Sequence, residues 1–186
     1  MISMIRTLLP IALLAVLPCH AQADKQKDDK APKQERETST GKISEVDSDD
    51  AGMNAAMAEA RKAFPTFWKA ISEDRKKAQP KLDPAMVKAK FSDKGKEDEA
   101  EHLWIDKVAY DGKTISGEVA SEPADLKSVK LGQKVSFPLE QLSDWLYVEN
   151  GMAKGAFTVQ YLRKKMNEKE RKEHDELYPF KFPALK

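Results

Sequence analysis

The sequence predicts an α+β domain: a curved antiparallel sheet or small open barrel of about five strands, flanked by N- and C-terminal helices. Two observations carry this prediction. Apolar residues recur with a helical period after residue 50 and again after residue 155. Between these stretches the period changes to two, as in strands, and turn dipeptides separate the segments. The domain is expected to span residues 51–180.

The first helix is expected to begin near Asp49 and Asp50, because acidic side chains suit a helix N-terminus. Pro65 lies within the helix and has no backbone N–H to donate, so we expect it to split the segment and open a second short helix. The apolar face, which we interpret as core, comprises Met53, Met57, Ala60, Phe64, Phe67 or Trp68, and Ile71.

Five short strands are expected next. Asp111-Gly112 predicts a hairpin between two of them, and Asn150-Gly151 predicts a turn after the last. Pro138 is expected to close the fourth strand, since proline interrupts a strand ladder. The expected strands are residues 87–91, 103–110, 114–120, a short one around 135–137, and 145–148.

A last helix is expected to start between residues 155 and 157, with Leu162 and Met166 on its buried side. Residues 167–176 are almost wholly charged, and we interpret them as the solvated end of the same helix. A tail punctuated by prolines follows, and its aromatic residues could fold back onto the domain. Its apolar residues are Leu177, Tyr178, Phe180 and Phe182.

The first 23 residues have the pattern of a secretory signal peptide. Arg6 provides the positive charge, residues 8–17 form a short apolar run, and Ala21-Gln22-Ala23 matches the cleavage pattern. We therefore expect cleavage after Ala23 and a periplasmic or secreted protein. The apolar run is too short to span a bilayer. Lipid attachment at Cys19 is less favoured, because Pro18 stands where a small residue is preferred.

Residues 24–50 predict a disordered charged linker, since they contain few large apolar residues. The chain has 32 basic and 31 acidic residues, and removal of Arg6 with the signal leaves 31 of each. Such a balanced charge argues against a nucleic-acid partner. Cleavage would also remove Cys19, the only cysteine, which leaves no thiol chemistry in the mature chain.

The sequence contains no Gly-rich phosphate loop, no zinc-type histidine pair and no Gly-x-Ser-x-Gly nucleophile elbow. His102 is the only histidine in the expected domain core, so we expect no metal and no cofactor. The catalytic candidates are Glu101, His102 and Asp144, because His102 could donate to Asp144 if their strand ends are neighbours. The alternative, which we favour, is that these polar groups satisfy one another and the backbone within the fold.

Three aromatic residues beside these polar groups are candidates for binding: Trp104, Trp145 and Tyr147. Aromatic walls stack well on sugar or peptide rings, but tryptophans of this kind equally fill a core. Adjacent strand residues point to opposite faces of a sheet. Asp144 and Trp145 are therefore not expected to line the same pocket.

Three segments of the chain resemble one family. They are residues 53–68, which include Phe64-Pro65-x-Phe67-Trp68; residues 101–104, Glu-His-Leu-Trp; and residues 131–158, from Leu131-Gly132-Gln133 to Phe157-Thr158. Together they resemble the YegJ-like family, the domain of unknown function 2314, over residues 52–166. The resemblance implies a compact α+β domain, often exported from bacteria, with no established activity. The linker and charged tail lie outside this range.

The favoured function is an exported, non-catalytic interaction module that recognises a protein or a component of the cell envelope. One alternative is a small periplasmic hydrolase that uses His102, Asp144 and Glu101. A second is an inhibitor or immunity-type protein that blocks an enzyme. The interaction and inhibitor hypotheses need no catalytic constellation, in agreement with the missing motifs.

Overall fold

The computed structural model of the chain describes residues 37–38, 41–42 and 50–185. The expected signal peptide lies outside the described residues. Of the expected linker, only Asp50 and two short strands are described, β1 (Glu37–Thr38) and β2 (Gly41–Lys42), which pair antiparallel. The fold described below concerns residues 50–185.

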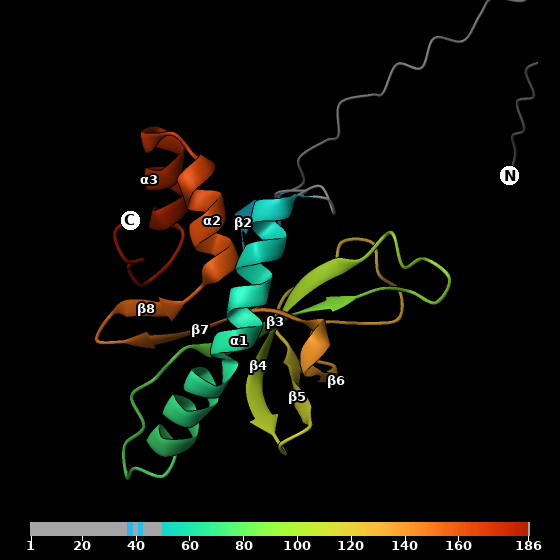
Figure 1. Ribbon diagram of the computed structural model, residues 1–186, viewed down its shortest axis with the longest axis horizontal. Helices are drawn as coiled ribbons and strands as arrows, with labels where there is room; N and C mark the ends of the chain where they lie inside the picture. The colour runs from blue at the N-terminus through green and yellow to red at the C-terminus, as the bar shows by residue number, and fades with distance from the viewer. Residues whose placement is uncertain (1–36, 39–40, 43–49, 186) are drawn as a thin grey trace, which may run out of the picture. The chain divides into compact units, whose positions relative to one another are not determined.

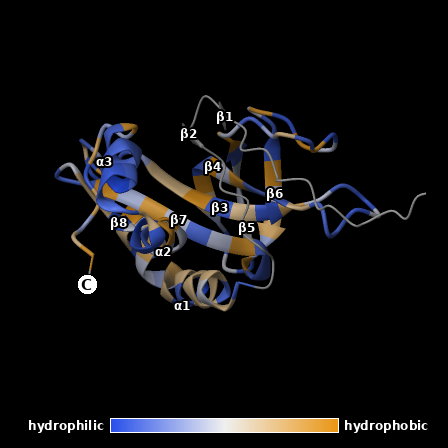
Figure 2. Cartoon of the chain, turned by 90° about the horizontal axis from the view of Figure 1, so that it is seen from above, coloured by the Kyte–Doolittle hydropathy of each residue, from blue (hydrophilic) through white to orange (hydrophobic). Residues whose placement is uncertain are grey.

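One open antiparallel sheet of six strands, with three helices, forms the domain and confirms the α+β prediction. The strand order is β6-β5-β4-β3-β7-β8. Helix α1 lies across one face of the sheet, and α2 and α3 gather near the β7–β8 end (Figures 1 and 2). The strands are β3 (Ala85–Phe91), β4 (Glu101–Tyr110), β5 (Thr114–Val119), β6 (Lys134–Pro138), β7 (Leu142–Glu149) and β8 (Met152–Gly155).

Helix α1 runs without interruption from Ala51 to Asp74, so the predicted split at Pro65 is wrong. An internal proline costs about 3 kcal/mol. Phe67 and Ile71, two and six residues beyond it, are fully buried, and each such side chain stabilises the fold by about 1.5–3 kcal/mol. Burial of these residues outweighs the missing hydrogen bond, while the proline itself stays exposed.

Asp50 caps α1 as expected: its Oδ1 accepts hydrogen bonds from the backbone N–H groups of Gly52 and Met53 at 2.9 and 3.0 Å. The same carboxylate accepts from the Tyr161 hydroxyl at 2.5 Å and pairs with Lys165 at 2.6 Å. Because Tyr161 and Lys165 belong to α2 (Phe157–Lys165), this cap also joins the first helix to the second.

The charged C-terminal stretch is a separate helix, α3 (Glu168–Glu176), rather than the end of α2. Asn167 and Glu170 form a reciprocal capping box that starts it afresh, which explains the break at Met166. The aromatic tail folds back as anticipated. Phe182 is buried in a second apolar cluster with Leu146 and Val159, separate from the main core under α1.

Candidate functional site

Glu101 opens β4 and holds the loop that follows β5. Its carboxylate accepts hydrogen bonds from three consecutive backbone N–H groups, those of Ala124, Asp125 and Leu126, at 2.6–2.9 Å. A carboxylate with this many main-chain donors is committed to the local structure. Glu101 thus shapes the loop and does not face His102, its neighbour along the strand.

Asp144 is fully buried in β7, where it caps helix α2 from outside that helix. Its Oδ1 accepts from the backbone N–H groups of Trp145 and Phe157, and its Oδ2 from the N–H and hydroxyl of Thr158, at 2.5–2.9 Å. The residue before the helix, Ala156, is left-handed and supplies no side-chain cap. Asp144 therefore neutralises the positive end of α2 in its place.

Lys88 is the cation whose charge acts on this carboxylate. Lys88 and Asp144 are cross-strand partners in the β3–β7 ladder. The Lys88 Nζ lies 3.5 Å from the Thr158 hydroxyl and 4.6 Å from the centre of the Trp104 ring. Burial lowers the pKa of Lys88 and raises the pKa of Asp144, while the charge of each partly opposes the shift of the other.

His102 contacts Ser143 instead of Asp144. Its Nδ1 lies 2.7 Å from the Ser143 Oγ, which also donates to the Lys88 carbonyl at 3.3 Å. A register shift in the β3–β7 ladder pairs Lys88 with Asp144 and Ala89 with Leu142, so Ser143 is the extra, bulged residue. Desolvation, with the charges of Lys88 and Lys90, lowers the pKa of His102 to about 4. The ring is therefore neutral at pH 7.

The three aromatic candidates occupy different environments. Trp145 is buried, its Nε1 donates to the Ala60 carbonyl at 2.8 Å, and its ring packs on Phe67 and Phe157. Tyr147 stacks on Trp145 with the two ring planes 6° apart. Trp104 packs on the other apolar cluster, beside Lys88. Trp145 and Tyr147 thus belong to the packing under α1, and Trp104 lies on the opposite face.

Sequence reasoning missed Lys88, Ser143 and Thr158 in this polar cluster. Lys88 looked like an ordinary solvated strand position between Val87 and Ala89. Ser143 enters only because of the bulge, and the sequence carries no signal for it. Thr158 had one available signal: a hydroxyl residue at the first turn of an expected helix is a common partner for a capping carboxylate.

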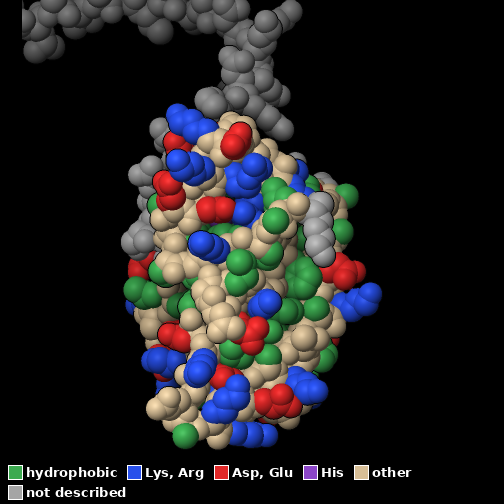
Figure 3. Space-filling model, turned by 90° about the vertical axis from the view of Figure 1, so that its left-hand side faces the viewer, with side chains coloured by type: hydrophobic (Ala, Val, Ile, Leu, Met, Phe, Trp, Pro, Cys, Tyr) green, Lys and Arg blue, Asp and Glu red, His purple; other side chains and the backbone are tan. Residues whose placement is uncertain are grey.

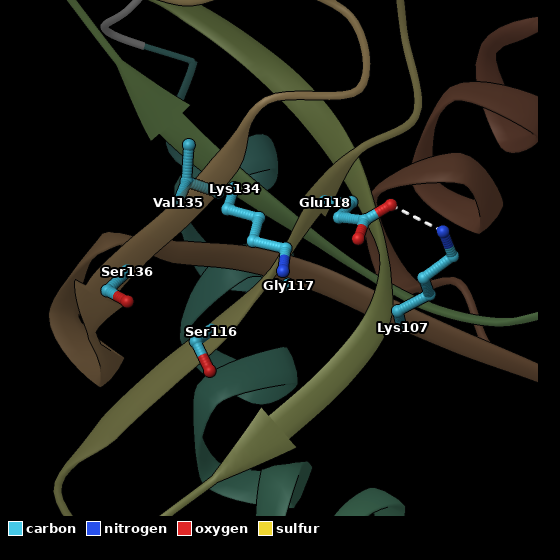
Figure 4. A pocket seen from close by; sticks show the side chains of 7 residues that line it. All are labelled: Lys107, Ser116, Gly117, Glu118, Lys134, Val135 and Ser136. Atoms are coloured by element: carbon cyan, nitrogen blue, oxygen red, sulfur yellow. Dashed lines mark hydrogen bonds and ion pairs between the residues drawn. The ribbon is translucent and has the colours of Figure 1, made fainter.

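None of the catalytic candidates lines either of two hollows on the domain. The first, about 410 Å³, lies on strands β5 and β6, where Ser116, Ser136 and Lys134 surround it. Figure 4 shows these side chains and the ion pair between Lys107 and Glu118 at its rim. The second, about 690 Å³, lies beside the C-terminal end of α1.

The surface carries charges of both signs. On the face in Figure 3, basic and acidic side chains are interspersed with apolar ones, and no extended area of one sign is visible. Within the part of the chain that is described, three or more metal-ligating side chains do not gather in any one place. No described helix is both long and apolar enough to cross a bilayer.

The fold and its polar cluster define a small α+β domain. Its candidate catalytic residues, Glu101, His102 and Asp144, make their side-chain contacts with other groups of the same fold. The chain belongs to the family described as "Uncharacterized protein conserved in bacteria (DUF2314)", whose model matches residues 50–182. The resemblance to the YegJ-like family is thereby confirmed. The family model covers more of the chain than the expected residues 52–166. It also includes α3 and most of the tail, which the sequence comparison had left outside the family.

Two curated relatives are similar to this chain. One is the "Putative ankyrin repeat protein NMB1133/NMB1171" of Neisseria meningitidis serogroup B, 40% identical over 138 residues, which are 74% of this chain and 54% of the relative. The other is "Uncharacterized protein YegJ" of Escherichia coli, 28% identical over 111 residues, or 60% of this chain and 67% of the relative. The chain thus spans about half the length of the Neisseria relative. No solved structure matches it.

Proposed function

We propose that this protein is an exported, non-catalytic interaction module of the bacterial cell envelope, which recognises a protein or an envelope component. One observation carries the proposal: Glu101 and Asp144 direct their carboxylates to backbone donors within the fold. Acid–base catalysis instead needs a group within hydrogen-bond reach of a substrate. The signal-like N-terminus supports export.

The Neisseria relative adds support of a different kind. That relative is named a "putative ankyrin repeat protein". Ankyrin repeats stack into extended binding surfaces. A segment similar to this chain within such a protein fits a role in recognition.

A small hydrolase is the second candidate, because the 2.7 Å contact between His102 and Ser143 pairs a base with a hydroxyl. Two features count against it. Ser143 is only 1% exposed, and neither of the two hollows reaches it. A screen of peptidoglycan, ester and phosphoester hydrolysis separates the candidates. Turnover that disappears in His102→Ala and Ser143→Ala, with the unfolding curves unchanged, would refute the interaction module.

Export and partner binding are tested in cells. Intact mass of the protein from the periplasm or medium is expected to correspond to a chain that starts at Asp24; a lipid on Cys19 would contradict this processing. Photo-crosslinking residues at Leu131 and Leu177, the two exposed large apolar side chains within residues 50–185, are expected to capture a defined partner. Lys62, exposed on α1, is the control position. Equal capture from all three positions, or from none, argues against a specific module.

A further inference from the structure

Four side chains form a compact group on the face of the sheet opposite α1. The intervening residues of β3 and β4 are buried in the core under α1: Val87, Ala89, Leu103 and Ile105. Alternation along each strand therefore directs their neighbours to the other face. The register pairs Lys88 with Trp104 and Lys90 with His102. Since residues directly opposite in an antiparallel pair have β-carbons about 4.5–5.5 Å apart, these four side chains are neighbours.

The exposed part of this group carries positive charge that no described carboxylate balances. Lys90 and His102 are both exposed, and no described residue pairs with the Lys90 ammonium. The charges of Lys88 and Lys90 both act on the His102 ring. Asp144, which faces Lys88 from β7, is fully buried, and its two oxygens accept hydrogen bonds from within the fold. An anionic ligand would therefore complement the surface at Lys90 and His102.

The hydrogen bonds of Ser143 determine which nitrogen of His102 carries the proton. The Ser143 hydroxyl has one proton, which it donates to the Lys88 carbonyl at 3.3 Å. Its oxygen can then only accept from the His102 Nδ1 at 2.7 Å, so Nδ1 holds the ring proton. In the neutral ring, Nε2 therefore carries a lone pair. No described residue bonds to Nε2, so this atom is available to a ligand.

An exposed lone pair beside an ammonium group selects a particular chemistry. The ligand needs an anionic oxygen that accepts from Lys90 and an O–H group that donates to the His102 Nε2. A phosphate monoester provides both when it holds one proton, and its second pKa is about 6. An ionised carboxylate, a sulfate ester and a phosphate diester carry no such proton near neutral pH. The arrangement therefore favours a phosphate monoester over other anions.

We propose that Lys90 and His102 bind the phosphate monoester of a phosphorylated sugar. The phosphate would accept from the Lys90 ammonium and donate to the His102 Nε2, while Lys88 adds positive charge behind the ring. Trp104 is half-buried and lies next to His102 on the same face of β4, where its ring would contact the sugar. This assignment rests on the proposed function and specifies the envelope component as a phosphorylated glycan.

The test is isothermal titration calorimetry of the whole protein with glucose 6-phosphate, and with glucose 6-sulfate as the comparison. At pH 6 the phosphate should bind about tenfold or more tightly than the sulfate, because only the phosphate can donate to Nε2. Lys90→Ala and His102→Asn should each weaken phosphate binding by a similar factor. Asparagine keeps a polar atom at the Nδ1 position and has none at Nε2. Lys134→Ala, at an exposed lysine of β6, should leave binding unchanged.

The pH dependence separates this site from simple charge attraction. The titratable and polar groups that face the His102 ring are Lys88 and Lys90 from β3 and Ser143 from β7, and Asp144 lies beyond Lys88. Phosphate binding should strengthen as pH falls from 8 to 6, because the monoester gains the proton that it donates. Sulfate binding should stay constant over this range. Charge attraction alone predicts the opposite trend, since the phosphate loses negative charge as pH falls.

Several results would overturn the inference. They are equal affinity for the phosphate and the sulfate, phosphate affinity that rises with pH, and unchanged affinity in Lys90→Ala or His102→Asn. The comparison of phosphate with sulfate uses the wild-type protein, so it does not depend on whether a variant folds. Tighter binding of O-phosphoserine amide, or of vesicles that contain phosphatidic acid, than of glucose 6-phosphate would reject the sugar as the carrier of the phosphate.

The site and the proposed function can fail separately. If crosslinking captures a defined envelope partner but glucose 6-phosphate does not bind, the site assignment fails while the interaction module stands. If glucose 6-phosphate binds as expected but the protein stays in the cytoplasm with its N-terminus uncleaved, the site stands and the proposed function fails.

Discussion

Asp144 and Thr158 form a double hydrogen bond across the boundary between a strand and a helix: the Asp144 Oδ2 accepts both the backbone N–H and the hydroxyl of Thr158. The pair is fully enclosed, since Asp144 and Thr158 are 0% and 3% exposed. It fixes where helix α2 starts relative to β7.

Asp144→Ala should destabilise the protein by about 3–5 kcal/mol, because it leaves buried backbone donors without their acceptor and Lys88 without the opposite charge beside it. Thr158→Val removes only the hydroxyl and should cost about 1 kcal/mol. Urea unfolding measures both. If Asp144→Ala costs no more than Thr158→Val, the carboxylate is not the cap of α2.

Gly155→Ala tests the close approach of the backbone to the core. Gly155 has φ of 77°, and a β-carbon there would lie 2.4 Å from the Trp145 ring. Gly112 has φ of 99° with open space around it, so Gly112→Ala is the matched control for backbone strain alone. Strain should cost about 1–2 kcal/mol in both variants, and Gly155→Ala should cost more. Similar unfolding midpoints for the two would contradict the packing around Trp145.

Trp145→Ala should cost about 3–5 kcal/mol, the usual range for a buried large aromatic residue. Trp68, which is only partly buried against the same core, should tolerate the same substitution better. Chemical denaturation provides the comparison. A small loss at Trp145 together with lost partner binding would place that residue on a recognition surface instead.

His102 makes stability depend on pH. Its pKa is lowered from 6.5 to about 4 in the folded protein, so the unfolded chain binds more protons between these values. Stability should therefore rise as pH increases from about 4 to 6.5. In His102→Gln this contribution should be absent. The quantity to measure is the difference in the free energy of unfolding between the two proteins as a function of pH. A difference that does not change with pH would mean that the ring titrates normally.

Glu101→Gln should loosen the loop after β5 without unfolding the sheet. Hydrogen exchange at the amides of Ala124, Asp125 and Leu126 should accelerate, because these amides lose a charged acceptor. Ser128 is a neighbouring reference, since its amide is bound by Asp93 instead. Unchanged exchange at the three amides would show that the carboxylate does not hold the loop.

Much of the fold was predictable because its signals are local. The turns at Asp111-Gly112 and Asn150-Gly151 lie where their conformational preferences indicate, and Gly112, Asn150 and Gly151 all have positive φ. Strand β8 was missed because its four residues, Met152–Gly155, show no clear alternation. The continuity of α1 through Pro65 also escaped prediction, because it depends on tertiary packing that no local rule contains.

The candidate site was less predictable because its contacts depend on strand order. β3 lies between β4 and β7, and it brings Lys88 next to Asp144. The bulge at Ser143 then places that hydroxyl beside His102. Neither the strand order nor the bulge can be derived from residue spacing. The contacts among Lys88, Ser143 and Asp144 therefore become visible only in the folded structure.

The tail contributes more than packing. Lys181 donates to the Gly151 carbonyl and accepts from the Ala153 amide, so the chain end forms a parallel bridge beside β8. An unprotected strand edge is a template for joining another chain. Within the described domain, the molecule thus seals one border of its sheet with its own C-terminus. Any assembly by strand addition would have to start at β6, where Lys134 and Pro138 oppose it.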